Sequence, residues 1–202
     1  MDFTIRAATE NDMYEISEVH RTCFTDNFSS SLGVKLLSKY YLEFYTENPS
    51  LFYVCVNADG KICGFVMGYI LGATNAISSF LKNNRFSMAL RVFMLLLKFD
   101  RLAWRKVFGI FLKKKNTSSV SSNVKDGQGD LLSICVTDDM KGSGAASSLV
   151  KKYEEAVKKL GCSKCYLTCE TSNPRGLAFY KKLGYAVESE TPYKICFWKD
   201  LD

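Results

Sequence analysis

The feature that most constrains the fold is a strand, a glycine-containing turn and a helix in direct succession in the last third of the chain. Residues 130–137 read DLLSICVT, which predicts a strand, and residues 145–160 repeat apolar side chains at helical spacing. Between them, residues 141–144 read KGSG. Such a turn directs free backbone N–H groups and the positive end of the helix dipole at one point, and its glycines let a large anion come close. The sequence therefore predicts an α/β fold with a cradle for a pyrophosphate group, the alternative being a turn merely relaxed by its glycines.

The turn differs from two common phosphate-binding motifs. It lacks the GxxxxGK[ST] pattern of a P-loop, and with two glycines it does not complete the fingerprint of a Rossmann dinucleotide site. A second motif follows one strand later, where residues 173–185 read NPRGLAFYKKLGY. Gly184 in this segment is typical of the residue that ends a helix in the left-handed conformation.

Taken together, the two motifs resemble those of the GNAT superfamily of acyl-CoA N-acyltransferases. In that family the cradle reads R/Q-x-x-G-x-G/A after a strand, and the later helix reads N-x-x-A-x-x-[LF]-Y-x-K-x-G-[FY]. Both patterns occur here in the family's order and spacing. Two positions depart from them. Lys141 supplies a positive charge without the fork of an arginine, and Gly176 stands where alanine is usual, which lowers helix propensity.

Hydrophobic patterning predicts the other elements. Strands are expected at residues 2–7, 51–56, 62–71, 130–137, 164–170, 185–187 and 193–199, and helices at 13–24, 32–45, 79–98, 101–115, 145–160 and 174–183. A polar loop is expected at residues 25–31. The resemblance implies the GNAT fold over a single domain, residues 1–202, with a central mixed, mostly antiparallel sheet flanked by helices. A basic helical insertion at about residues 73–129 would separate the third and fourth strands.

The resemblance also implies acetyl-CoA as co-substrate and assigns residues to it. The end of the fourth strand would pair through its backbone with the pantetheine arm, and the turn would hold the pyrophosphate through main-chain N–H groups. Asn173 would contact the cofactor arm, and Tyr180 would protonate the departing CoA thiolate. For Tyr180 the alternative is packing in the core. The expected cofactor-binding residues of the strand and turn are Ile134, Cys135, Val136, Lys141, Gly142, Ser143, Gly144, Ala145 and Ala146.

Two acids are candidates for the base that takes the proton of an acceptor amine. Asp130 lies at the position of a glutamate in the histone-acetyltransferase branch of the superfamily, and because it is shorter we expect a bridging water. Glu170 shares a strand face with Thr168, where ribosomal-protein N-terminal acetyltransferases carry a glutamate. The alternative for each is a solvated or ion-paired acid at a strand end. His20, the only histidine, is a candidate substrate contact or else a packing residue on the first helix.

Positive charge is concentrated in the insertion. The 202 residues carry a net charge of +6, yet residues 79–115 contain ten basic residues and one acid, so this segment carries +9 and the rest −3. We expect its helices to pack on the sheet edge or on a second subunit of a homodimer. The alternatives are an acceptor lid whose arginines bind a substrate phosphate, and a helix pair lying on an anionic membrane surface. No nucleic-acid-binding motif accompanies the charge, so nucleic acid is not an expected partner.

Other patterns narrow the class of protein. No apolar stretch reaches the roughly 20 residues of a membrane-spanning helix, and the N-terminus lacks the pattern of a signal peptide. The eight cysteines are therefore expected as reduced, mostly buried thiols of a cytoplasmic protein. Residues 162–165 form a lone CxxC without further ligands at suitable spacing, so no metal site is expected.

The sequence thus predicts an N-acetyltransferase that moves an acetyl group from acetyl-CoA directly to a primary amine in a ternary complex. The acceptor is expected to be a small amine such as an amino sugar, because the charge of the insertion would suit a phosphate on it. A protein N-terminus or lysine is the alternative acceptor. The alternative from another class is a non-catalytic CoA-binding sensor or membrane-surface scaffold, and the presence of Tyr180 favours the enzyme.

Overall fold

The centre of the molecule is a seven-stranded sheet with the strand order β1-β2-β3-β4-β5-β7-β6. It is seen in a computed structural model that describes residues 2–25, 28–97 and 127–201. All neighbouring strands are antiparallel except β4 and β5, which are parallel. The predicted mixed, mostly antiparallel sheet is therefore confirmed. The strands are β1 (Phe3–Ala7), β2 (Phe52–Asn57), β3 (Ile62–Ile70), β4 (Gly129–Val136), β5 (Lys164–Glu170), β6 (Ala186–Glu190) and β7 (Lys194–Asp200).

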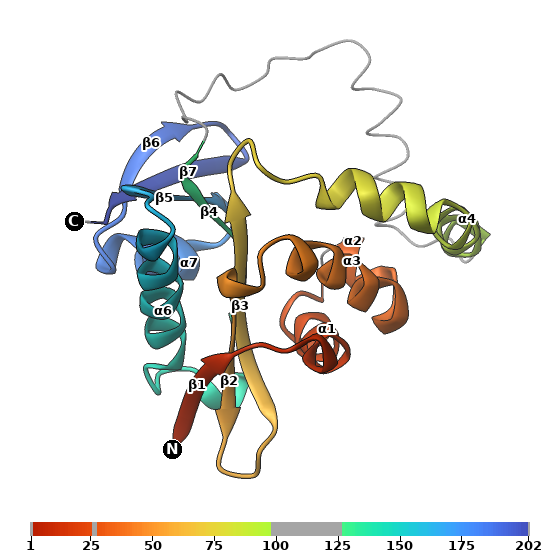
Figure 1. The fold of residues 1–202 in the computed structure, drawn as a ribbon, viewed down its shortest axis with the longest axis horizontal. Coiled ribbons are helices and arrows are strands. Elements are labelled where there is room, and N and C mark those ends of the chain that lie inside the picture. The colour runs from red at the N-terminus through yellow and green to blue at the C-terminus, as the bar shows by residue number, and fades with distance from the viewer. Residues whose placement is uncertain (1, 26–27, 98–126, 202) are drawn as a thin grey trace.

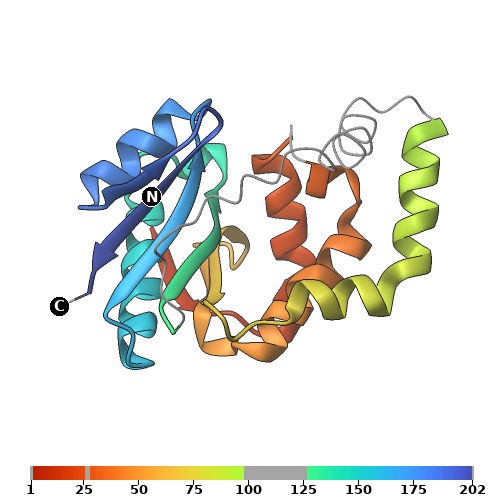
Figure 2. The ribbon, with the colours of Figure 1, turned by 90° about the horizontal axis from the view of Figure 1, so that it is seen from above.

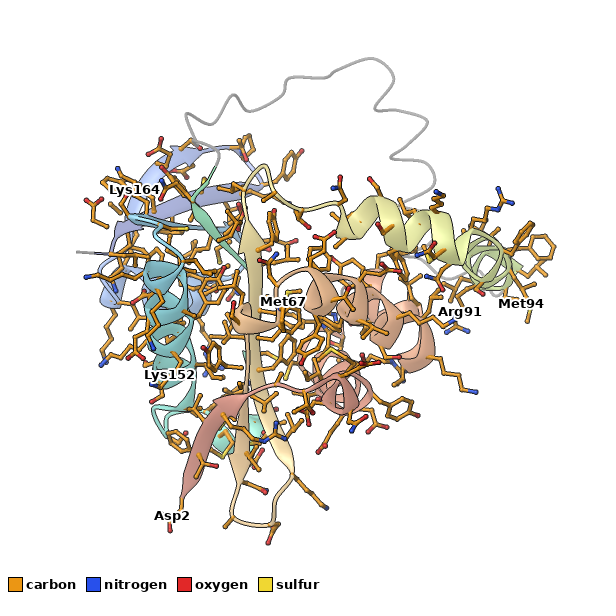
Figure 3. All side chains as sticks on the ribbon, in the orientation of Figure 1. Asp2, Met67, Arg91, Met94, Lys152 and Lys164 are labelled. Atoms are coloured by element: carbon orange, nitrogen blue, oxygen red, sulfur yellow. The ribbon has the colours of Figure 1, made fainter. Side chains whose placement is uncertain are left out.

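Helices cover both faces of the sheet (Figures 1 and 2). α6 (Ala145–Lys159) and α7 (Pro174–Lys182) lie on one face, and α1 (Met13–Cys23), α2 (Phe28–Ser31) and α3 (Val34–Glu47) lie on the other. Each face has its own apolar core, because successive side chains of a strand point to opposite sides. Leu149 and Tyr153 of α6 belong to the first core, and Tyr41 of α3 and Met67 of β3 belong to the second. Met67 lies in the middle of the molecule in Figure 3.

The strands β4 and β5 pair only at their beginnings. Gly129, Asp130 and Leu131 of β4 stand opposite residues 165–167 of β5, and no further pair of these two strands follows. β4 nevertheless continues to Val136 and β5 to Glu170. The strand pair therefore opens towards its carboxyl ends, which is where the turn before α6 lies.

Gly68 fixes how closely β3, β4 and α6 approach one another. The Tyr153 hydroxyl of α6 donates to the Asp130 carbonyl oxygen at 2.7 Å, directly beside Gly68. A Cβ atom on Gly68 would lie 2.1 Å from each of these two oxygens. Only glycine leaves room for this contact, and the contact holds the beginning of β4 in place.

The insertion follows β3, as expected, and its described helix is α4 (Ala76–Leu97). The helix bends at Asn84, whose backbone leaves the helical region (φ −118°, ψ 16°), and its two arms are seen in Figure 2. Phe80 of the first arm packs on Leu36 of α3. Met94 lies near the outer end of the second arm, away from the sheet (Figure 3). The predicted helix 101–115 and most of the loop after it lie outside the described residues.

Several predicted boundaries are wrong, each for a local reason. The expected polar loop 25–31 contains α2, which is held by the Ser31 hydroxyl donating to the Phe28 carbonyl oxygen at 2.7 Å and by the Ser30 hydroxyl donating to the Phe24 carbonyl oxygen, just ahead of the segment, at 2.5 Å. α3 begins at Val34, two residues later than expected, since Gly33 has a φ of 89° and cannot belong to a right-handed helix. Charge and hydrophobicity do not report these local conformations.

Two further boundaries were set by tertiary contacts. α4 begins at Ala76 instead of residue 79, because Glu47 of α3 accepts the Asn75 N–H at 3.0 Å and the Thr74 hydroxyl at 2.5 Å just ahead of it. The strand expected at 185–187 is β6, which runs on through polar residues to Glu190 while it pairs with β7. None of the residues of β6 is buried, so neither face of this edge strand requires apolar side chains.

Candidate active site

A groove of about 760 Å³ runs along the end of β4 and the turn before α6. Most of the residues predicted to bind the cofactor line it, namely Ile134, Cys135, Val136, Lys141, Gly142, Gly144, Ala146 and Asn173. Ser143 and Ala145 belong to the same turn but do not line the groove. The Ser143 hydroxyl donates to the Met140 carbonyl oxygen at 2.8 Å, and Ala145 is fully buried. These two residues therefore stabilise the conformation of the turn and do not face the groove.

The turn adopts its form through two glycines. Gly142 and Gly144 have φ values of 84° and 90°, in the left-handed region that glycine enters without strain. A Cβ atom on either would meet nothing within 4 Å, so the backbone conformation, and not crowding, requires glycine here. Among the described residues the N–H groups of Gly142 and Gly144 have no partner, whereas the Lys141 and Ser143 N–H groups bond within the turn. The Ala145 N–H, the first of α6, donates to the Ser143 hydroxyl oxygen at 3.2 Å, so the N–H groups of Gly142 and Gly144 are the unused donors of the turn beside the groove.

Three basic side chains line the groove in the described part of the chain, and the sequence analysis missed two of them. Lys141 forms an ion pair with Asp138, which lowers the pKa of that carboxyl. Arg175 and Lys182 of α7 were not singled out. Their separation of seven residues places them on one helix face, and this signal in the second motif could have revealed them.

A second cavity of about 510 Å³ lies between the open ends of β4 and β5 and the helices α1 and α3. It is lined by the hydroxyl-bearing and aromatic side chains of these elements together with both predicted acids, Asp130 and Glu170. Ile134, Asn173 and Tyr180 line both this cavity and the groove along β4. The two spaces therefore meet at these three residues, where β4 and β5 diverge.

Tyr180 is held at this junction by aromatic packing. Its ring centroid lies 5.3 Å from that of Phe179, 5.9 Å from Tyr185 and 6.0 Å from Phe197. Burial raises the pKa of the Tyr180 hydroxyl above its ordinary value, so the phenol keeps its proton at neutral pH. The ring therefore packs in the core, and the residue also lines both cavities.

Asp130 lies at the beginning of β4, where the second cavity begins. Burial raises its pKa to about 6, and the Tyr69 hydroxyl, which donates to the carboxylate at 3.2 Å, limits the rise. A carboxylate with a pKa close to neutral is a stronger base than an exposed one while still being ionised at pH 7. Glu170 lies at the other end of the cavity, exposed at the end of β5, and the Ser172 hydroxyl donates to it at 3.4 Å.

Asn173 begins α7. Its side-chain oxygen accepts the Gly176 N–H at 2.9 Å, which caps the helix. A Cβ atom at position 176 would lie 2.6 Å from the Asn173 amide nitrogen. Glycine at this position, a departure from the family pattern, therefore leaves room for the cap.

His20 is a buried residue of the second cavity wall. Its Nδ1 lies 2.5 Å from the Tyr41 hydroxyl and its Nε2 lies 3.1 Å from the Ser29 hydroxyl. Burial lowers the pKa of His20 to about 4, so the ring is neutral at physiological pH. Sequence patterns do not indicate that Tyr41 and Tyr69 line the same cavity as His20, because the three residues come from elements far apart in the chain.

Among residues 2–25, 28–97 and 127–201 there is no group of three or more His, Cys, Asp or Glu that could hold a metal ion. All eight cysteines lie in these ranges as free thiols, and five of them are buried, as predicted. No helix of the same ranges is long and apolar enough to cross a membrane.

A sequence profile of the Acetyltransferase (GNAT) family matches residues 100–185, which include the cradle and the whole of the second motif. Over these 86 of its 202 residues, the chain is similar to the GNAT family. An uncharacterized N-acetyltransferase of Bacillus subtilis (strain 168), YobR, is 28% identical over 98 residues. That alignment covers 48% of this chain and 40% of YobR, so the chain matches about two fifths of the length of this relative.

Solved structures extend the likeness of fold to the whole chain. Ard1 from Thermoplasma volcanium superposes with a TM-score of 0.60 at 16% identity, covering 99% of this chain and 98% of that one. The PaiA N-acetyltransferase from Thermoplasma acidophilum, solved in complex with coenzyme A, gives a TM-score of 0.62 at 16% identity and covers 99% of each chain. The GNAT fold predicted from the two motifs is confirmed.

Proposed function

We propose that this GNAT protein is an acetyl-CoA-dependent N-acetyltransferase that transfers the acetyl group directly to a small primary amine. The observation that supports it most is the meeting of two cavities at Ile134, Asn173 and Tyr180. Direct transfer requires a donor and an acceptor that reach one another through a single opening. A groove for the donor on one side and a separate cavity on the other provide this arrangement.

The groove has the chemistry that CoA requires. Its turn offers unused N–H donors, and Lys141, Arg175 and Lys182 add positive charge for the phosphates. The end of β4, residues 134–136, lies beyond the last pair with β5 and has a free backbone edge for the pantetheine amides. When bound, acetyl-CoA would supply the activated acyl group.

Two residues would handle the protons. Asp130, with a pKa raised to about 6, would take the proton of the acceptor amine through a bridging water. Tyr180 would give a proton to the departing thiolate, because its raised pKa keeps the phenol protonated until the sulfur develops charge. Glu170 is the second candidate base, from the opposite end of the cavity.

The second cavity favours a cationic acceptor. Asp130 and Glu170 line it with the rings of Tyr40 and Tyr69, which suit an ammonium group, and Lys194 is the one lysine or arginine among the described residues that line it. Its volume of about 510 Å³ fits a small molecule. A phosphate-bearing amino sugar stays a prediction. Arg91 of the described insertion donates at 2.8 and 3.0 Å to the Ser31 carbonyl oxygen and does not line this cavity (Figure 3).

The role of the insertion and the oligomeric state of the protein also stay predictions. Phe86, Leu90 and Phe93 of α4 are exposed, at 77, 64 and 57% of their surface, which would suit a second subunit or a membrane surface alike. A cytoplasmic location agrees with the free cysteines.

The test is release of free CoA thiol from acetyl-CoA with a panel of acceptors: putrescine, spermidine, glucosamine, glucosamine 6-phosphate and a peptide with a free N-terminus. We expect at least one small amine to raise the release tenfold or more above hydrolysis without amine. If none does so while calorimetry still shows CoA binding, the enzyme proposal fails for this panel. The non-catalytic CoA-binding sensor is then the better description.

A further inference from the structure

Two thiols lie side by side where α1 ends against β4. Cys23, the last residue of α1, donates from its sulfur to the Val136 carbonyl oxygen at 3.4 Å. The Cys135 thiol lies within hydrogen-bonding reach of the Cys23 sulfur, and both side chains are half-buried at the edge of the same core. Both also line the cofactor groove. The sequence separates them by more than a hundred residues, and the fold brings them together.

The two thiols differ in acidity. A hydrogen bond from Cys135 lowers the pKa of Cys23 to about 7, against the opposing effect of burial, and the Thr22 hydroxyl and Lys141 act in the same direction as Cys135. Asp138 is the acid that acts against them. Burial raises the pKa of Cys135 well above its ordinary value. Cys23 is therefore divided between thiol and thiolate near neutral pH, and its neighbour stays protonated.

Such a pair has the composition of a redox-sensitive site. A thiolate that solvent can reach is the nucleophile that attacks disulfides, and an adjacent second thiol can then resolve the mixed disulfide. The Cys55–Cys63 pair of β2 and β3 provides a contrast. Its sulfurs are 3.5 Å apart, but both are buried and burial raises both pKa values.

We propose that Cys23 is a modification site for low-molecular-weight disulfides that bear a CoA moiety, and that Cys135 resolves the adduct into an intramolecular disulfide. In the first step the Cys23 thiolate attacks one sulfur of CoA disulfide, which forms a Cys23–CoA disulfide and releases one CoA thiolate. In the second step Cys135, as it loses its proton to solvent, attacks the Cys23 sulfur and releases the second CoA thiolate. The two cysteines are oxidised by two electrons, and CoA disulfide is reduced to two CoA thiols.

The position of Cys23 determines how its oxidation affects CoA binding. Its sulfur contacts the Val136 carbonyl oxygen, on the strand segment that the proposed function assigns to the pantetheine arm. A CoA moiety attached to Cys23 would occupy the groove, and a bond to Cys135 would fix the end of α1 against this segment. Oxidation should therefore weaken CoA binding. The choice of CoA disulfide depends on the proposed function, whereas the reactivity of the thiol pair does not.

Mass spectrometry of the intact chain separates the steps. The wild-type chain, incubated with CoA disulfide at pH 7.5, is expected to end two hydrogen masses lighter, with Cys23 and Cys135 joined in one cross-linked peptide. Cys135→Ala is expected to stop at the adduct of one CoA, and Cys23→Ser to remain unmodified at these positions. Cys196→Ser, a half-buried thiol of β7 outside the groove, is the matched control and should behave as wild type.

Glutathione disulfide and iodoacetamide distinguish groove recognition from reactivity alone. We expect CoA disulfide to react at least tenfold faster than glutathione disulfide, and free CoA to protect Cys23 from both. If glutathione disulfide reacts as fast as CoA disulfide while iodoacetamide still labels Cys23 first, then the thiol pair stands but the CoA groove, and with it the proposed function, loses support.

Two results would overturn the proposal itself. One is that Cys23→Ser is oxidised as fast as wild type, which would place the reactive thiol elsewhere. The other is that the oxidised chain binds CoA with unchanged affinity, where we expect a loss of tenfold or more that a reductant restores. Thermal unfolding of each variant confirms that it folds, and Cys135→Ser replaces Cys135→Ala if the alanine variant does not.

Discussion

Replacing Asp130 by asparagine should stabilise the fold while it removes the proposed base. Asp130 has a pKa of about 6 in the folded chain against an ordinary value of 3.8, and the main cause is burial. A carboxyl whose folded pKa is raised costs the fold free energy once it ionises. The amide of Asp130→Asn cannot ionise, and its oxygen can still accept the Tyr69 hydroxyl that bonds the carboxylate at 3.2 Å.

The folded and ordinary pKa values of Asp130 determine whether its ionisation stabilises or destabilises the fold, and over which pH range. Below pH 3.8 the carboxyl is protonated in both the folded and the unfolded chain, so its ionisation costs nothing. Between pH 3.8 and about 6 the unfolded chain ionises first, and the stability of the fold falls as the pH rises. Above about pH 6 the cost is complete. A difference of about two pKa units corresponds to about 3 kcal/mol, and because the side chain is half-buried we expect about 1–3 kcal/mol.

The assay is urea unfolding of wild type and Asp130→Asn from pH 4.5 to pH 8. The free energy of unfolding of the variant should exceed that of wild type by about 1–3 kcal/mol at pH 8 and by less as the pH falls. Asp59→Asn, at an exposed turn, is the control and should show no such trend. A variant that is less stable than wild type at pH 8, or a difference that does not change with pH, would refute the reasoning. Turnover with the best amine of the panel should fall about 100-fold or more in Asp130→Asn.

Further predictions concern the junction and the cradle. Tyr180→Phe should lower kcat about 100-fold and leave the Kd for CoA within twofold by calorimetry, and an unchanged kcat would remove Tyr180 from the acid role. Gly144→Ala should lower stability by about 1 kcal/mol in urea unfolding, because its φ of 90° strains any other residue, and should weaken CoA binding at the same time. Gly176→Ala should lower the Tm, since its Cβ would lie 2.6 Å from the Asn173 amide nitrogen; a Tm equal to or above wild type would show that the Asn173 cap adapts to it.

The sequence alone predicted the parts of this protein that depend on neighbouring residues. The glycines at 142 and 144, followed by a helix, indicate the cradle because their conformational freedom and the helix N-terminus act within a few residues. Periodicity located all seven strands and most helices to within a few residues, because burial on one face imposes period 2 or 3.6. It ended β6 three residues too early, because the polar residues 188–190 are held by pairing with β7 and not by burial.

Only the tertiary structure decided how the site is assembled. Arg175 and Lys182 join the groove through the placement of α7, and Cys23 meets Cys135 through the packing of α1 on β4. The raised pKa of Asp130 arises from burial among groups that β3 and α6 bring to it. The sequence specifies which chemical groups are present and their local conformation. Their distances, their exposure to water and hence their acidity depend on contacts between segments far apart in the chain.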